Sequence, residues 1–174
     1  APGGAGAASV RPAGVGAVGV GGSVAVVVAR GGTRGPADGA IDHVHGFTLD
    51  SDVSVPHPDY YRPAVRFKCR DGFCPLGPAI VPVAALDDVD AIGLTVRIDG
   101  AVAVSASTPT PIRPLRELIA DVTALMSFDA GDVLLPGVAG GPPRARAGRT
   151  IEIAPAGTRP PRPTPQPDAA RYSQ

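Results

Sequence analysis

The sequence contains no tryptophan, one methionine, two cysteines and, among its 16 basic residues, a single lysine. Two cysteines cannot build the disulfide framework of a small secreted domain. Basic and acidic residues balance at 16 each, and this zero net charge argues against a nucleic-acid-binding protein, which needs a basic patch or stripe. Glycine or proline interrupts every apolar run before it reaches the roughly 20 residues of a membrane span.

The first residues also lack the charged start and apolar core of a secretory signal. A chain of 174 residues suits one domain and is long enough to bury a core. We therefore expect a single cytoplasmic domain that interacts with neither membranes nor nucleic acids.

Glycine and proline are abundant, with 23 and 21 residues, yet 44% of the chain is hydrophobic. The disorder that glycine and proline favour must therefore be local. We predict a low-complexity, loosely ordered segment over residues 1–20, one domain over residues 21–156, and a proline-rich disordered tail over residues 157–174.

Several short strands and one helix are predicted within the domain. The strands span residues 23–29, 48–55, 94–98, 101–105, 133–135 and 150–153. The turn Asp99-Gly100 between two of them is typical of a type I′ hairpin. The helix follows Pro114 and has apolar residues at helical spacing. These are Leu115, Leu118, Ile119, Val122, Leu125 and Met126. The pattern indicates a mainly β, α+β fold with one amphipathic helix.

Three polar clusters have simple structural interpretations. His43 and His45, with Asp50 and Asp52 nearby, could meet a metal ion from one strand face, but surface or packed histidines are the favoured interpretation. The C-x4-C pair (Cys69, Cys74) lacks a second ligand pair, so buried thiols are favoured over zinc. The arginines of the last cluster favour a solvated turn over an anion site. They are Arg144, Arg146 and Arg149.

The segment YYRPAVRFKCRDGFCPLGP, residues 60–78, is the most informative part of the sequence. It holds the lone Lys68, and five of the seven aromatic residues lie between positions 47 and 73. The segment resembles the signature stretch of the fumarylacetoacetate hydrolase superfamily. GFTLDSD (46–52), the Asp-Gly hairpin and FDAGD (128–132) resemble further landmarks of that superfamily in the same order. The resemblance covers residues 21–153, roughly three quarters of the chain.

Within the superfamily, KCRDGFCP resembles the N-terminal half of the bifunctional isomerase/decarboxylases of 4-hydroxyphenylacetate (homoprotocatechuate) degradation. The resemblance implies the superfamily's mixed β-sandwich roll. It also implies a homodimer, or a heteromer with a metal-bearing homologous subunit. The implied substrates are 2-oxo or enol dicarboxylic and tricarboxylic acids.

The metal ligands of the superfamily are mostly missing. Its best understood members hold Mg²⁺ or another divalent ion with a Glu-x-Glu and the Asp of an Asn-Asp pair. Here the two glutamate positions fall on Gly21 and Ser23, which leaves Asp52 as the one candidate ligand, and one carboxylate is a poor Mg²⁺ site. The superfamily's T-G-T-P loop is here residues 136–139, without hydroxyls. We therefore expect no cofactor.

The remaining charged residues carry the expected chemistry. Lys68 matches the superfamily's catalytic lysine by position, and its ammonium would stabilise an enolate. Arg66 and Arg70 would share a face with it if the segment is extended. Asp71 is expected to fix the lysine, and Asp52 to accept a proton.

A substrate carboxylate would be bound by a tyrosine and three arginines, although a structural hydrogen-bond network is an equal alternative. These four residues are Tyr61, Arg62, Arg66 and Arg70. Three functions stay open: an isomerase/decarboxylase of aromatic catabolism, a metal-free subunit that scaffolds a metal-bearing partner, and an enzyme acting on another keto-enol substrate.

Overall fold

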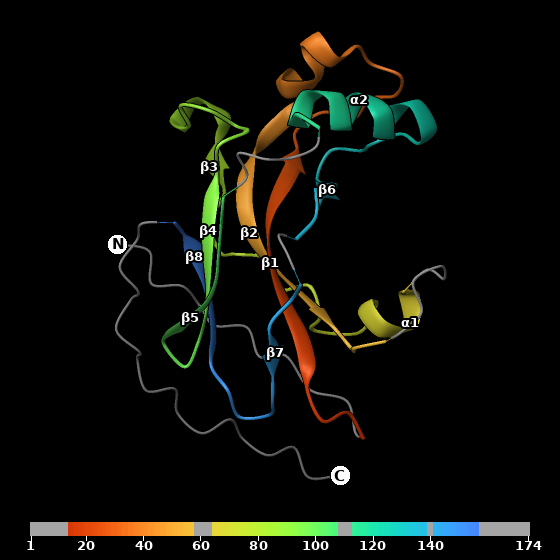
Figure 1. Cartoon of the computed structure of the whole chain (residues 1–174). Coiled ribbons are helices and arrows are strands. Elements are labelled where there is room, and N and C mark those ends of the chain that lie inside the picture. The colour runs from red at the N-terminus through yellow and green to blue at the C-terminus, as the bar shows by residue number, and fades with distance from the viewer. Residues whose placement is uncertain (1–13, 58–63, 108–112, 139–140, 157–174) are drawn as a thin grey trace.

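The chain forms two antiparallel β-sheets that pack face to face (Figure 1). This computed structural model describes residues 14–57, 64–107, 113–138 and 141–156. The first sheet has the order β3-β2-β1-β6, with β7 also pairing to β1, and the second has the order β5-β4-β8. The predicted mainly β fold with an amphipathic helix is confirmed.

The predicted strands and helix are all present, and several short elements are added to them. In chain order the elements are β1 (Val18–Val28), η1 (Ala37–His43), β2 (Val44–Ser54), α1 (Val65–Lys68), β3 (Val81–Pro82), η2 (Val83–Ala85), β4 (Gly93–Ile98), β5 (Ala101–Ser107), α2 (Leu115–Leu125), β6 (Val133–Leu134), β7 (Arg144–Ala145) and β8 (Ile151–Pro155). The predictions of a loosely ordered N-terminal segment and a disordered C-terminal tail fall mostly on residues 1–13 and 157–174, which lie outside the described residues.

Strand β1 begins at Val18, five residues before its predicted start. The glycines that obscured this start are required by packing. A Cβ on Gly22 would lie 2.7 Å from Val96 Cγ2 and 2.9 Å from Leu94 Cδ1 of the second sheet. The two sheets therefore approach each other closely at this position, and β1 is a central strand with β2 on one edge and β6 and β7 on the other.

The β4–β5 hairpin has the predicted Asp-Gly turn. Asp99 and Gly100 both have positive φ, 51° and 79°. A type I′ turn requires this conformation at both central residues, and Asp-Gly supplies it at low cost. The prediction of this hairpin is confirmed.

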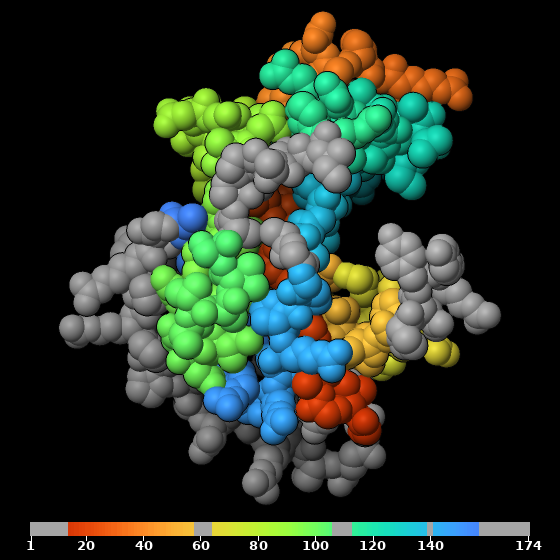
Figure 2. All heavy atoms as spheres, viewed as in Figure 1, coloured from red at the N-terminus to blue at the C-terminus, as the bar shows by residue number. Residues whose placement is uncertain are grey.

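Helix α2 and the helical turn η1 lie against each other at one end of the molecule, and Figure 2 shows their atoms as one continuous cap. The buried face of α2 consists of Leu115, Ile119 and Thr123. The prediction that Leu125 and Met126 extend this face is wrong, because they are 92% and 60% exposed. The helix ends at Leu125 and Met126 is already extended, so neither residue reaches the core.

The core has two clusters along β1. The larger one lies between β1, β2, β4, η1 and α2, and the smaller one surrounds Val20, Val53 and Phe73 near β7. No helix among the described residues is long and apolar enough to span a membrane.

Candidate functional site

The register of β1 and β2 brings the key positions together. Gly21 lies opposite Asp52, and Ser23 lies opposite Asp50. Since side chains alternate along a strand, these four positions share one face of the first sheet. It is the face turned away from the second sheet, because the intervening Gly22 contacts β4.

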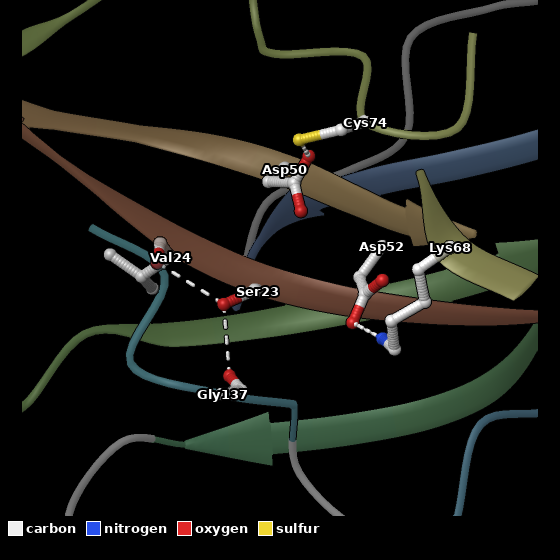
Figure 3. A network of polar contacts seen from close by, with 7 residues as sticks. All are labelled: Ser23, Val24, Asp50, Asp52, Lys68, Cys74 and Gly137. Carbon is white, nitrogen blue, oxygen red and sulfur yellow. Dashed lines mark hydrogen bonds and ion pairs between the residues drawn. The ribbon is translucent and has the colours of Figure 1, made fainter. Parts of the chain in front are cut away.

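Lys68 reaches this face from α1 and forms an ion pair with Asp52 (Figure 3). The backbone of α1 is one helical turn, in which the N–H of Lys68 donates to the Ala64 carbonyl and that of Cys69 to the Val65 carbonyl. The lysine and aspartate side chains are 43% and 23% exposed. The pair is therefore fixed by a direct contact yet accessible to a small molecule.

The helical turn corrects the expectation of an extended segment with three cations on one face. Arg66 and Arg70 lie one turn apart, and Arg70 Nε donates to the Arg66 carbonyl at 2.9 Å. The Arg66 guanidinium lies 4.6 Å from the centre of the Phe67 ring, on which His57 also stacks. Arg66 is two residues from Lys68 within the helical turn and therefore lies on another side of it, and Arg70 follows the end of α1, so the extended row of three cations is not formed.

The structure places Asp52, and not Asp71, against the lysine. Asp71 is exposed and forms no ion pair with Lys68. Tyr61 and Arg62, predicted to bind a substrate carboxylate, lie outside the described residues.

The residues on this face do not fit a divalent metal ion. Val138 packs over Gly21, where an added Cβ would stand 2.5 Å from Val138 Cγ1. The Ser23 hydroxyl donates to the Gly137 carbonyl at 2.9 Å, and Asp52 is engaged by Lys68. The loop after β6 thus occupies the space that two glutamate side chains would need. Among the described residues, no group of three His, Cys, Asp or Glu side chains could hold a metal ion, and this includes His43 and His45.

Asp50 is a buried carboxyl group that the sequence analysis did not assign to the site. Its residue is 1% exposed, and Cys74 Sγ donates to its Oδ1 at 3.2 Å. Its Oδ2 is buried without a hydrogen-bond partner. Burial raises the pKa of Asp50 above its ordinary value, and burial together with the contact to Asp50 raises the pKa of the Cys74 thiol to about 11. The only available signal was its place two residues before Asp52, on the same strand face.

The two remaining polar clusters give no catalytic geometry. The favoured interpretation of both cysteines as buried thiols is wrong: Cys69 and Cys74 are exposed free cysteines, although the Cys74 sulfur donates to the buried Asp50. Arg144 and Arg146 are exposed, and Arg149 is paired with Asp99. The interpretation as a solvated turn holds for Arg146 and Arg149, which flank the turn at residues 147–148, whereas Arg144 lies in β7.

Known proteins resemble this chain over most of its length. It is 32% identical over 133 residues to the 4-hydroxyphenylacetate degradation bifunctional isomerase/decarboxylase of Salmonella dublin, covering 76% of the chain and 30% of that protein. It is 31% identical over 142 residues to the oxaloacetate tautomerase YisK of Bacillus subtilis (strain 168), covering 76% of the chain and 46% of that protein. The chain therefore spans less than half the length of these relatives.

A solved structure has the same fold. The 5-carboxymethyl-2-hydroxymuconate delta-isomerase of Mycobacterium smegmatis superposes with a TM-score of 0.74 at 30% identity, over 84% of this chain and 57% of that one. The family described as fumarylacetoacetate (FAA) hydrolase C-terminal matches residues 2–159. The chain accordingly belongs to the fumarylacetoacetate hydrolase family.

Proposed function

We propose that the chain carries an isomerase/decarboxylase activity on 2-oxo or enol dicarboxylic and tricarboxylic acids of the homoprotocatechuate meta-cleavage pathway. The two reactions are isomerisation of 2-hydroxyhepta-2,4-diene-1,7-dioate and decarboxylation of 5-oxopent-3-ene-1,2,5-tricarboxylate. The observation that carries the proposal is the accessible Lys68–Asp52 ion pair on the outer face of the first sheet.

In the isomerisation, Lys68 and Asp52 have complementary roles. The Asp52 carboxylate takes the proton of the enol hydroxyl, and the ammonium of Lys68 donates hydrogen bonds to the oxygen that gains negative charge. The electron pair of the O–H bond forms the carbonyl, the diene electrons shift, and the distal carbon receives a proton. A fixed ammonium is suited to this step because it needs no reorientation as the charge develops.

In the decarboxylation, the same ammonium donates to the oxygen of the substrate ketone. The bond from carbon to the departing carboxylate breaks, its electron pair moves through the conjugated double bond onto that oxygen to form a dienolate, and carbon dioxide leaves. Reprotonation at carbon then completes the reaction. Arg66, Arg70, Tyr61 and Arg62 are proposed to bind the remaining substrate carboxylates, with Asp71 as a further acid close in sequence.

Relatives support this substrate class. The bifunctional isomerase/decarboxylase and the delta-isomerase are named for this chemistry, and the tautomerase is named for another keto-enol acid, oxaloacetate. Oxaloacetate is therefore the first alternative substrate to compare with the two homoprotocatechuate intermediates.

A second candidate function is that of a subunit without activity, which scaffolds a metal-bearing homologue as a homodimer or heteromer. The observation that favours it is Val138, which closes the position where a glutamate ligand would stand. A scaffold subunit would show no turnover alone, even though Lys68 is intact, and would co-purify with its metal-bearing partner.

Replacing Lys68 by alanine tests the proposed function. We expect kcat/KM for the active substrate to fall by a factor of about 10² to 10³, the loss typical of one charge-stabilising donor. Thermal unfolding should change little, since a half-exposed ion pair contributes about 0–1 kcal/mol. Arg116→Ala, at an exposed position on α2, is the matched cation control and should keep full activity. Equal turnover in Lys68→Ala and wild type would refute the lysine mechanism.

A further inference from the structure

A cavity lies at the end of β1 opposite the Lys68–Asp52 pair, beneath the cap formed by η1 and α2. It has a volume of about 140 Å³. Its apolar wall includes Val26 and Val28 of β1, Ile119 of α2, Phe128 and Leu134. The cavity shares no residue with the Lys68–Asp52 site.

The cavity has the size and chemistry of a pocket for one small ring. An apolar cavity of roughly 150 Å³ in another protein stays dry and takes up benzene. Val26, Val28 and Ile119 are buried. The hydroxyl of Thr123, at the same wall, is satisfied by the Ala120 carbonyl at 3.0 Å. This apolar wall therefore gives water molecules few hydrogen-bond partners, and an apolar ligand would supply the van der Waals contacts that the empty space lacks.

The lining of the cavity includes one permanent cation, Arg30, and no described residue in that lining carries a carboxylate. The Arg30 Nη2 donates to the Asp42 carbonyl at 3.0 Å, and His43 Nδ1 lies 3.1 Å from the Arg30 carbonyl oxygen. Arg30 is exposed, so its guanidinium retains N–H groups that can face a ligand.

We propose that this cavity binds a small aromatic carboxylate, with the ring against Val28, Ile119 and Phe128 and the carboxylate at Arg30. The apolar wall selects the ring, and the guanidinium at the mouth selects an anionic group over a neutral one. The cavity is thus a binding site separate from the proposed catalytic face.

Binding of benzoate to the full chain tests the proposal, with benzene and acetate as the ring and the carboxylate alone. Methyl NMR spectra should show benzoate shifting the signals of Val26, Val28 and Ile119, with weaker binding of benzene and none of acetate. Arg30→Met should weaken benzoate binding about two- to fivefold, the range of an exposed ion pair, and leave benzene binding unchanged.

A filled cavity provides the second test. Ala120→Leu adds a side chain at a lining position, whereas Ala124→Leu adds the same side chain at an exposed position of the same helix. We expect the first variant to lose benzoate binding and the second to keep it. The proposal is overturned if benzoate leaves the three methyl signals unmoved, or if it binds equally well to Ala120→Leu. Equal binding of benzene and benzoate would overturn the role of Arg30.

Discussion

The two ends of the β1–β2 ladder differ in what covers them. At the end nearer β7, glycine and polar residues face outward, and Lys68 and the loop after β6 close over them. At the end nearer β6, valines and Phe47 are covered by η1 and α2. Figure 1 shows α1 and α2 at these opposite ends.

The reactive side chains and the main hydrophobic packing thus lie at opposite ends of the same two strands, β1 and β2. The polar end has the Lys68–Asp52 ion pair and the buried carboxyl of Asp50, and the side chain of Val138 packs over Gly21 beside them. The apolar end has a larger core and an incompletely filled cavity. The polar end therefore holds the residues of the proposed activity, and the apolar end holds the larger hydrophobic core.

The largest expected effect lies at the apolar end. Ile119→Ala removes a side chain that is 7% exposed and should lower the free energy of unfolding by about 2–5 kcal/mol. Leu125→Ala, on the same helix but 92% exposed, should change it by less than about 0.5 kcal/mol. Chemical denaturation of both variants measures the difference. Similar losses would show that α2 is packed differently from the account given above.

A smaller effect is expected where the loop meets β1. Gly21→Ala places a Cβ against Val138 and should cost about 1–3 kcal/mol, the range of an overpacked site. Gly39→Ala meets no atom within 4 Å and should be neutral or stabilising by about 0.4–1 kcal/mol. The double variant Gly21→Ala/Val138→Ala should recover part of the loss. If Gly21→Ala is as harmless as Gly39→Ala, then Val138 does not close the site.

The smallest effect concerns pH. The raised pKa of Asp50 means that the folded state holds its proton at pH values where the unfolded chain has lost it. The contribution of Asp50 to stability is therefore fully present below the ordinary value of 3.8 and is lost as pH rises through the raised pKa, by about 1.4 kcal/mol for each unit by which the pKa is raised. Cys74, Asp52 and Lys68 face this carboxyl and modulate the shift.

Asp50→Asn should remove this decline, because the amide has no proton to lose. Unfolding free energies measured from pH 4 to pH 8 should be flatter in this variant than in wild type. Asp87→Asn, at an exposed position, should keep the wild-type slope. A wild-type slope in Asp50→Asn would assign the pH dependence to another group.

Local chemistry explains which parts of the fold could be predicted. The Asp99-Gly100 turn and the period of α2 depend on neighbouring residues, and both were recognised. The first residues of β1 were missed because glycine there reflects contact with Leu94 and Val96, more than 70 positions away in the sequence. The end of α2 was missed because apolar residues continue at helical spacing to Met126, although the helical backbone ends at Leu125.

The sequence allowed the residues of the site to be predicted, but not which of them contact one another. Lys68 was singled out as the lone lysine, and Asp52 as the remaining carboxylate. Their pairing, across 16 positions, depends on a helical turn in α1 that the sequence pattern did not show. Asp50 was considered only beside His43 and His45, because a carboxylate on an alternating strand is normally exposed, whereas here Cys74 and the bridge to Leu76 cover it.

Turnover of the unmodified chain in the presence and absence of EDTA, with metal analysis of the same sample, tests the central claim most directly. Loss of absorbance of 2-hydroxyhepta-2,4-diene-1,7-dioate or of the oxo acid reports the reaction. The account predicts turnover that survives EDTA in a sample without bound Mg²⁺, Mn²⁺ or Ca²⁺. Turnover that EDTA abolishes and Mg²⁺ restores would contradict it, and would return Asp52 to the role of a metal ligand.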